Sequence, residues 1–413
     1  MAKPLPQPVR IYRVGGSVRD EVLGREVADH DFVVVGATPE IMLASGFRPV
    51  GRDFPVFLHP ETQEEYALAR TERKQGTGHR GFAFFASPEV TLEDDLARRD
   101  LTINAMARDE YGRLIDPYGG ARDLEAGVLR HVSPAFAEDP LRVLRVARFA
   151  ARFGFAIAPE TLVLMRAIVD SGELATLAAE RVWQELAKGL AEPRPSRMLE
   201  ALAASGALRA LLPEVDALSG DARGAKLLRA LDHAAARGFA MPVRYAVLLQ
   251  TLGTEGSPTG TAAATHTARA VRLAERVSER LRAPTEARDL ARLAARHRAT
   301  VHRADALRPA EWLELFAAAD ALRRPERLAG LVDACECDAL AATAAGNTYP
   351  PRGVVDAAFG AVREVDAGAA ATAAIAAAAK AGAPAGSDAI AKAVRAARLA
   401  ALRRWRSGPA RSA

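Results

Sequence analysis

The chain has 413 residues, enough for two or more domains. Its composition is 49% hydrophobic and 26% charged with a net charge of +5, which is ordinary for a soluble protein and suits a polyanionic partner. The opening MAKPLPQPVR has no apolar core of a signal peptide, and no run of about 18 apolar residues predicts a membrane span. Cys335 and Cys337 are too few for a disulfide framework or a complete zinc site. We therefore expect a cytoplasmic protein with two reduced thiols.

The first elements in the chain predict a seat for phosphate. A strand over Ile11–Val14 is followed by Gly15-Gly16-Ser17 and then by a helical stretch from Val18 to Leu23. Glycines let backbone N–H groups approach an anion, and the start of a helix adds its positive dipole end. A tight turn without a ligand is the alternative interpretation of Gly-Gly after a strand.

Two acidic residues enter the next predicted strand, Phe32–Val35. In an extended chain Asp29 and Asp31 share a face, with His30 opposite. Two carboxylates beside a phosphate seat hold Mg²⁺ against a nucleotide triphosphate, which predicts nucleotidyl transfer. A solvated loop or a helix cap is the alternative for Asp-x-Asp alone.

In this order and spacing, Ile11–Gly36 resembles the polymerase-β-like nucleotidyltransferases, in the branch of bacterial tRNA nucleotidyltransferases (CCA-adding enzymes) and poly(A) polymerases. Sites of this family use a third carboxylate on a neighbouring strand, and the resemblance assigns that role to Glu65. A solvent-facing strand glutamate is the alternative. We predict a helix over Pro39–Ala44 and short strands over Phe54–Leu58, Tyr66–Ala69 and Leu114–Ile115.

The stretch Thr71–Phe85, TERKQGTGHRGFAFF, is rich in glycine and basic residues. We expect a mobile basic loop that closes over a substrate. The matching region of the family is a flexible loop coupled to the switch from C to A addition, and an ordinary solvated loop is the alternative.

The string LEDDLARRDLTINAM closely resembles the RRD-x-x-x-N motif of the family. We expect its Arg98, Arg99 and Asp100 at a helix start, with Asn104 four residues further on. Arginines there hold triphosphate oxygens bidentately, and Asp100 accepts a hydrogen bond from a ribose hydroxyl. A charged helix end is the alternative. The following Asp116–Gly120, DPYGG, predicts a turn, and the family has such a turn between head and neck.

The stretch FAEDPLRVLRVARF predicts base selection. Asp139 and Arg142 lie three residues apart and would be neighbours on a helix. A carboxylate accepts from the exocyclic amino group of cytosine or adenine, and a guanidinium donates to the adjacent ring positions, whereas uracil and guanine present the opposite pattern. On spacing alone a surface salt bridge is the better interpretation, but EDPLR resembles the family's templating motif E-D-x-x-R. By resemblance Arg145 and Arg148 also contact the nucleotide.

From about Pro134 onward nearly every pattern is helical. Glu180–Glu185, ERVWQE, opens an amphipathic helix that in the family stabilises the neck. Proteobacterial relatives carry a metal-dependent phosphohydrolase (HD) domain after the neck. Here Gln250-Thr251 occupies the expected place of the adjacent His-Asp pair, so we expect the helical frame of that domain without its metal site. Residues 367–385 are alanine-rich and predict either a helix or a linker before a basic end, Arg395–Arg411.

The predicted fold is an α+β head, a small mixed sheet with helices, followed by a long all-α neck, body and tail. Its predicted divisions are a catalytic head over 1–133, a neck over 134–200, a degenerate HD-like body over 201–345 and a tail over 346–413.

The resemblance implies template-independent addition of C, C and A to the 3′ end of tRNA from CTP and ATP. Asp29 and Asp31 would bind Mg²⁺, and the helical body and basic tail would hold the acceptor and TΨC arms of tRNA. One alternative is a poly(A) polymerase of the same superfamily, although Val50–Phe57 resembles the CCA-adding group. The other is a non-catalytic RNA-binding relative. The residues expected to hold the nucleotide are Gly15, Gly16, Arg19, Arg99, Asp100, Asn104, Asp139, Arg142, Arg145 and Arg148.

Overall fold

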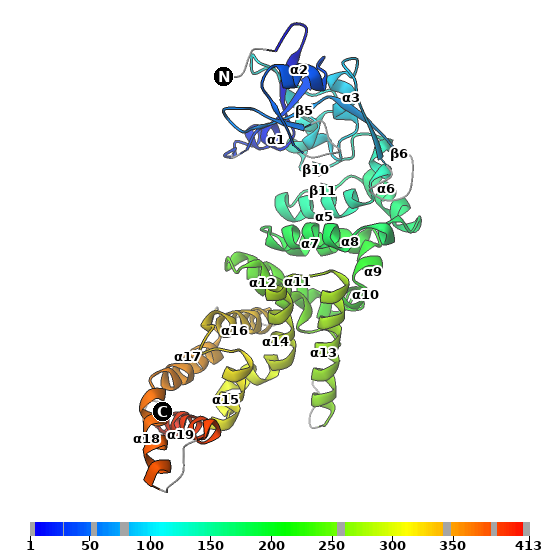
Figure 1. The fold of residues 1–413 in the computed structure, drawn as a ribbon. Helices are drawn as coiled ribbons and strands as arrows, with labels where there is room; N and C mark the ends of the chain where they lie inside the picture. The colour runs from blue at the N-terminus through cyan, green and yellow to red at the C-terminus, as the bar shows by residue number, and fades with distance from the viewer. Residues whose placement is uncertain are drawn as a thin grey trace. The chain divides into compact units, whose positions relative to one another are not determined.

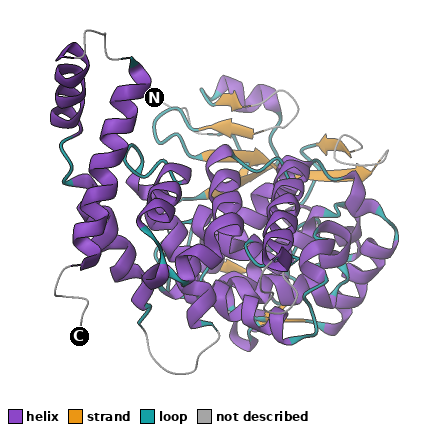
Figure 2. Cartoon of the chain, turned by 90° about the horizontal axis from the view of Figure 1, so that it is seen from below, coloured by secondary structure: helices purple, strands orange, loops and turns teal. Residues whose placement is uncertain are grey.

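A computed structural model describes residues 5–27, 29–50, 56–74, 82–253, 261–341, 348–380 and 386–407. The chain divides into two compact units, 1–217 and 218–413, which are described separately (Figure 1). Among the described residues the strands belong to the first unit, and helices joined by loops and turns make up the rest (Figure 2). The four predicted divisions of the chain stay predictions.

The first unit opens with a mixed seven-stranded sheet in the order β3-β4-β5-β2-β1-β8-β9. The pair β2 and β5 is parallel, and the other neighbours are antiparallel. This sheet confirms the predicted α+β head. Its strands are β1 (Arg10–Val14), β2 (Asp31–Val35), β3 (Arg48–Val50), β4 (Val56–Leu58), β5 (Glu65–Leu68), β8 (Ala107–Arg108) and β9 (Leu114–Ile115).

Both faces of the central strands are buried. Val33 packs in one cluster with Tyr12 and Leu96, and the next residue, Val34, packs in another with Met42. Successive residues of a strand point to opposite faces, so an uninterrupted apolar run such as Phe32–Val35 suits a strand covered on both sides. The helices and 3-10 turns of this part are α1 (Gly16–Val22), α2 (Pro39–Ala44), α3 (Leu92–Ala97), η2 (Thr102–Asn104) and α4 (Gly120–Ala126).

The predicted loop over Thr71–Phe85 was wrong at both of its ends. β6 (Arg70–Lys74) and β7 (Phe82–Ala86) pair antiparallel, with Thr71 opposite Phe85. Threonine and phenylalanine favour strands, and this preference outweighed the glycine and basic content of the stretch. Residues 75–81, like 51–55 of the segment Val50–Phe57, lie outside the described residues, so closure over a substrate stays a prediction.

Helices complete the first unit. α5 packs against α7 and α8, and in Figure 1 it runs beside the row in which these two helices lie. Their facing residues are apolar and buried, including Leu144, Trp183 and Met198. The elements are β10 (Val128–Leu129), η3 (Pro134–Glu138), α5 (Leu141–Phe153), β11 (Ala156–Ile157), α6 (Pro159–Asp170), η4 (Glu173–Thr176), α7 (Ala179–Ala191), α8 (Pro195–Ala204), α9 (Ala207–Leu211) and α10 (Pro213–Asp216).

The described residues of the second unit form helices joined by turns and loops. α12, α14 and α16 pack against one another, with Tyr245 buried on α12. The elements are α11 (Ala222–Ala236), α12 (Met241–Leu249), α13 (Thr261–Arg280), α14 (Thr285–His302), η5 (Ala304–Ala306), α15 (Pro309–Ala318), α16 (Pro325–Leu340), α17 (Pro350–Arg363), α18 (Ala367–Lys380) and α19 (Ser387–Ser407). No described helix is long and apolar enough to cross a membrane.

Gln250, the residue at the predicted position of the missing His-Asp pair, caps the end of α12. Its side chain is buried and donates from Nε2 to the carbonyl of Ala334 on α16 at 2.8 Å. The described residues hold no group of three or more His, Cys, Asp or Glu side chains that could bind a metal. Gln250 therefore joins two helices of this unit.

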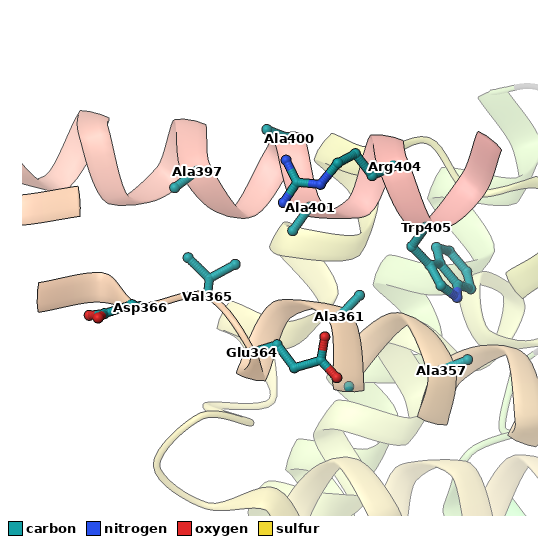
Figure 3. A pocket seen from close by; sticks show the side chains of 11 residues that line it. Ala357, Ala361, Glu364, Val365, Asp366, Ala397, Ala400, Ala401, Arg404 and Trp405 are labelled. Atoms are coloured by element: carbon teal, nitrogen blue, oxygen red, sulfur yellow. The ribbon is translucent and has the colours of Figure 1, made fainter. Parts of the chain in front are cut away.

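The alanine-rich segment is helical over α18, where no side chain is buried. Alanine has the highest helix propensity, so this helix depends little on packing. Alanine also accounts for a pocket of about 870 Å³ between α17 and α19. Ala357, Ala361, Ala397 and Ala400 line this pocket, and their side chains are too small to fill it (Figure 3).

Both cysteines lie on α16 and are buried as free thiols. Burial raises the pKa of Cys337 to about 12 and raises the pKa of Cys335 as well. Since the thiolate is the reactive form, we expect a thiol reagent at pH 8 to label neither cysteine in the folded protein and both after unfolding. Mass spectrometry of the labelled protein measures this, and rapid native labelling would contradict it.

Candidate active site

The glycine turn, one acidic residue and one arginine meet at the end of β1. Gly15 has φ +72°, a conformation that side-chain-bearing residues rarely adopt. A Cβ atom at Gly15 would lie 2.9 Å from Nη1 of Arg99 and 4.0 Å from Oδ2 of Asp31. The space above this glycine is therefore bordered by a carboxylate and a guanidinium, as a seat for a metal-bound phosphate requires.

Three acidic residues lie at the same end of the sheet. Asp31 opens β2 directly opposite Glu65 on the parallel strand β5, so their side chains share a face. Asp29 lies two residues before Asp31, and all three are exposed. Two carboxylates with substrate phosphates and water complete the oxygen shell that Mg²⁺ prefers, so this donor set fits a divalent cation without a third protein ligand.

A chain of polar side chains connects the turn with the helices that follow the sheet. Arg19 of α1 donates from Nη1 to Oδ1 of Asn104 at 2.6 Å, and Asn104 donates to Asp100 at 3.0 Å. Asp100 in turn accepts from Nε and Nη2 of Arg145 on α5, both at 2.7 Å. Four residues predicted from three separate motifs are thus joined in one network.

The RRD motif lies at the end of α3. The prediction that it lies at the start of a helix is therefore wrong. A capping box at Thr91 and Asp94 begins the helix earlier, and Arg98 is its C-cap. The sequence analysis missed Asp95, which is fully buried and pairs with Arg98 at 2.9 Å and Arg99 at 3.2 Å. Its place three and four residues before two arginines was the available signal.

Asp139 and Arg142 are not two residues of one helix, which corrects the prediction. Asp139 is extended, because Pro140 follows it and α5 begins only at Leu141. Its Oδ1 accepts from the N–H of Leu141 at 3.0 Å, and its Oδ2 accepts from Arg181 on α7 at 3.1 Å. Arg142 donates to the carbonyls of Ala135 and Arg98, at 2.8 and 2.6 Å.

Arg148 is buried on α5 and donates to Glu185 of α7 at 2.6 Å. The guanidinium lies over the ring of Phe149, 4.3 Å from its centroid. That of Arg19 lies over the same ring at 5.4 Å and over Phe153 at 5.0 Å. Two arginines predicted to hold the nucleotide thus lie on the aromatic residues of α5.

Asp100 gives the site a pH-dependent stability. Burial alone would raise the pKa of Asp100, but the Arg145 guanidinium and the Asn104 amide lower this pKa to about 2. A depressed carboxyl pKa stabilises the fold above the unfolded value near 4, and the contribution of about 2 kcal/mol is lost as pH falls toward 2. We expect Asp100→Asn to unfold at lower urea than wild type at pH 6, with roughly half of that gap gone at pH 3. A gap independent of pH would contradict this.

The sheet, the acidic pair and the basic network together define a nucleotidyltransferase. In agreement, residues 11–130 match the family model described as the poly A polymerase head domain. Residues 154–218 match a second model, described as the probable RNA and SrmB-binding site of polymerase A.

Comparison with curated relatives narrows the class. The chain is 54% identical over 376 residues to the multifunctional CCA protein of Nitrosospira multiformis, covering 88% of this chain and 91% of that protein. It is 57% identical over 377 residues to the multifunctional CCA protein of Aromatoleum aromaticum, covering 88% and 93%. A crystal structure of the Bacillus stearothermophilus CCA-adding enzyme in complex with CTP aligns with a TM-score of 0.70 at 27% identity, covering 96% and 89%. The chain belongs to the bacterial CCA-adding enzyme family, among the multifunctional CCA proteins.

Proposed function

We propose that this chain adds C, C and A to the 3′ end of tRNA, using CTP and ATP and releasing pyrophosphate without a nucleic acid template. The observation that carries the proposal is the meeting of Gly15, Asp31 and Arg99 beside the polar network from Arg19 to Arg145, which Arg99 joins at Asn104. The relatives named above support the substrate, because they are CCA proteins and align over most of both chains.

Asp29 and Asp31 would hold the metal, for which we propose Mg²⁺. Bound there, the ion would lower the pKa of the tRNA 3′-hydroxyl and neutralise the leaving pyrophosphate. Glu65, opposite Asp31, would orient its neighbour or supply a further oxygen. Gly15 and Gly16 would admit the phosphates close to the backbone.

Arginines of the network would bind the triphosphate. Arg99 borders the space above Gly15, and Arg19, Arg145 and Arg148 extend the basic lining onto α1 and α5. Each of these arginines has a carboxylate or amide partner in the structure. To bind a phosphate oxygen, the arginine would either use a further N–H donor or give up this partner. Asp100, beside Asn104, would then accept from a ribose hydroxyl.

Asp139 and Arg142 would select the base. One carboxylate oxygen of Asp139 would accept from the amino group of cytosine or adenine, and Arg142 would donate to the neighbouring ring acceptor. Among the described residues each oxygen of Asp139 has one hydrogen-bond partner and therefore keeps a lone pair for the base. Uracil and guanine present the wrong groups and would leave the pair unsatisfied.

The helical residues after the sheet would bind tRNA. Residues 154–218 match a model described as a probable RNA-binding site, and α19 ends in basic residues that include Arg403, Arg404 and Arg406. We propose that these helices hold the acceptor and TΨC arms through phosphate contacts, so that affinity falls as salt rises.

The proposal is tested with tRNA transcripts that end before CCA, after C and after CC. Each is incubated with Mg²⁺ and labelled CTP, ATP, UTP or GTP. We expect completion to CCA and then arrest. Addition of many A residues to any RNA 3′ end would make the chain a poly(A) polymerase, and addition of C alone or A alone would make it one half of a divided system. Absence of any addition would favour RNA binding without catalysis.

A further inference from the structure

We propose that Arg181 is a positioning residue for base selection, which holds the carboxylate of Asp139 in the orientation from which it reads the incoming base. The proposal rests on the function proposed above. It gives a specific task to a residue of the ERVWQE segment, whose sequence pattern alone indicates a neck-stabilising helix.

Asp139 depends on Arg181 because little else fixes its side chain. It lies in extended chain between η3 and α5, outside either helix. One hydrogen bond, from the N–H of Leu141 to Oδ1, is local to this corner. The bond from Nη2 of Arg181 to Oδ2 comes from α7, 42 residues further along the chain, and fixes the rotation of the carboxylate.

Arg181 keeps an unused donor at the same place. Its Nη1 is buried and has no hydrogen-bond partner among the described residues. A buried donor without a partner is unfavourable unless a bound molecule satisfies it. In the proposed site Arg142 donates to the ring acceptor beside the amino group, so Arg181 acts on the base through the carboxylate of Asp139.

The placement of α7 supports a role in the site rather than in stability alone. Arg181 and Glu185 lie four residues apart and therefore on one face of α7. Arg181 contacts Asp139, and Glu185 contacts Arg148, so one helix face holds two side chains of the proposed nucleotide site. The Arg181–Asp139 pair is about one fifth exposed on each side, and such pairs contribute more to geometry than to stability.

The test compares Arg181→Gln and Arg181→Lys with wild type in single-nucleotide addition to tRNA. Arg181→Gln should lower kcat/KM for CTP roughly 10- to 100-fold, as expected for a displaced binding group, and raise the share of UTP incorporated against CTP. Arg181→Lys keeps one charged donor, so its kcat/KM for CTP and its share of UTP should lie between those of wild type and Arg181→Gln. Arg113→Gln, which removes an exposed arginine at the β8–β9 turn, is the matched control and should behave as wild type.

A double variant separates positioning from a structural role. If Arg181 acts through Asp139, adding Arg181→Gln to Asp139→Asn should change neither kcat/KM nor the ratio of CTP to UTP further. Independent, multiplying effects would overturn the proposal, and so would a fall in activity with the ratio of CTP to UTP unchanged in both Arg181 variants. A wild type that adds no nucleotide to any tRNA would instead contradict the proposed function.

Discussion

Replacing Asp31 with alanine should reduce the rate of nucleotide addition to tRNA by about 10³-fold or more, with little change in melting temperature. The carboxylate is exposed at the start of β2 and borders the space above Gly15, so its loss removes a proposed metal ligand without opening the core. A bound metal supplies several kcal/mol of transition-state stabilisation, and each 1.36 kcal/mol is tenfold in rate. Single-turnover incorporation of labelled CTP measures this.

The matched control is Glu110→Ala, which removes another exposed carboxylate of the same unit at the β8–β9 turn. It should retain the wild-type rate. Asp31→Asn, which keeps the shape but not the charge, should be nearly as inactive as Asp31→Ala. Activity within tenfold of wild type for either Asp31 variant would move the proposed metal ligand elsewhere.

The largest effect on stability is expected for Gly120→Ala. Gly120 is buried at the start of α4, where its N–H donates to Asp116 at 2.7 Å. An added Cβ would overlap the backbone carbonyl of Thr102 and lie 2.9 Å from Cγ of Met106. Because a backbone carbonyl cannot rotate away, the cost should be about 3 kcal/mol, which corresponds to a melting temperature lower by roughly 6–12 °C.

The control is Gly353→Ala, which should not lower the stability of the protein. Gly353 lies within α17, and nothing is within 4 Å of the position that a Cβ would take. Alanine is favoured over glycine in a helix by up to about 1 kcal/mol, so Gly353→Ala should leave stability unchanged or raise it. Calorimetry of both variants decides this, and equal melting temperatures would show that Thr102 yields to the added carbon.

The sequence predicted an element correctly where the residues that form it lie within a few positions of one another. Pro39–Ala44 was predicted as a helix and is α2, because Thr38 caps it and Pro39 occupies the first turn. The DPYGG turn also has a local cause, since Asp116 accepts from the backbone N–H groups of Gly120 and Ala121. The closeness of Gly15 to Asp31 follows from β1 and β2 pairing with Val14 opposite Asp31.

Contacts between distant residues were not predictable from spacing. Arg145 pairs with Asp100, 45 residues away, and no periodicity connects them. The Asp139–Arg142 spacing indicated a helix pair, yet the proline between them keeps Asp139 out of the helix, and Arg181 supplies its guanidinium partner. The roles of the site residues, Glu65 among them, stay predictions until the variants are measured.

The network of side chains also sets an order of events during synthesis. The ribosome releases the sheet first, but Asp100 is buried beside a guanidinium that belongs to α5, and Arg148 of α5 depends on a carboxylate of α7. A nascent chain ending near residue 133 would therefore leave Asp100 without its guanidinium partner Arg145. The polar network is thus completed only after residue 185 has emerged.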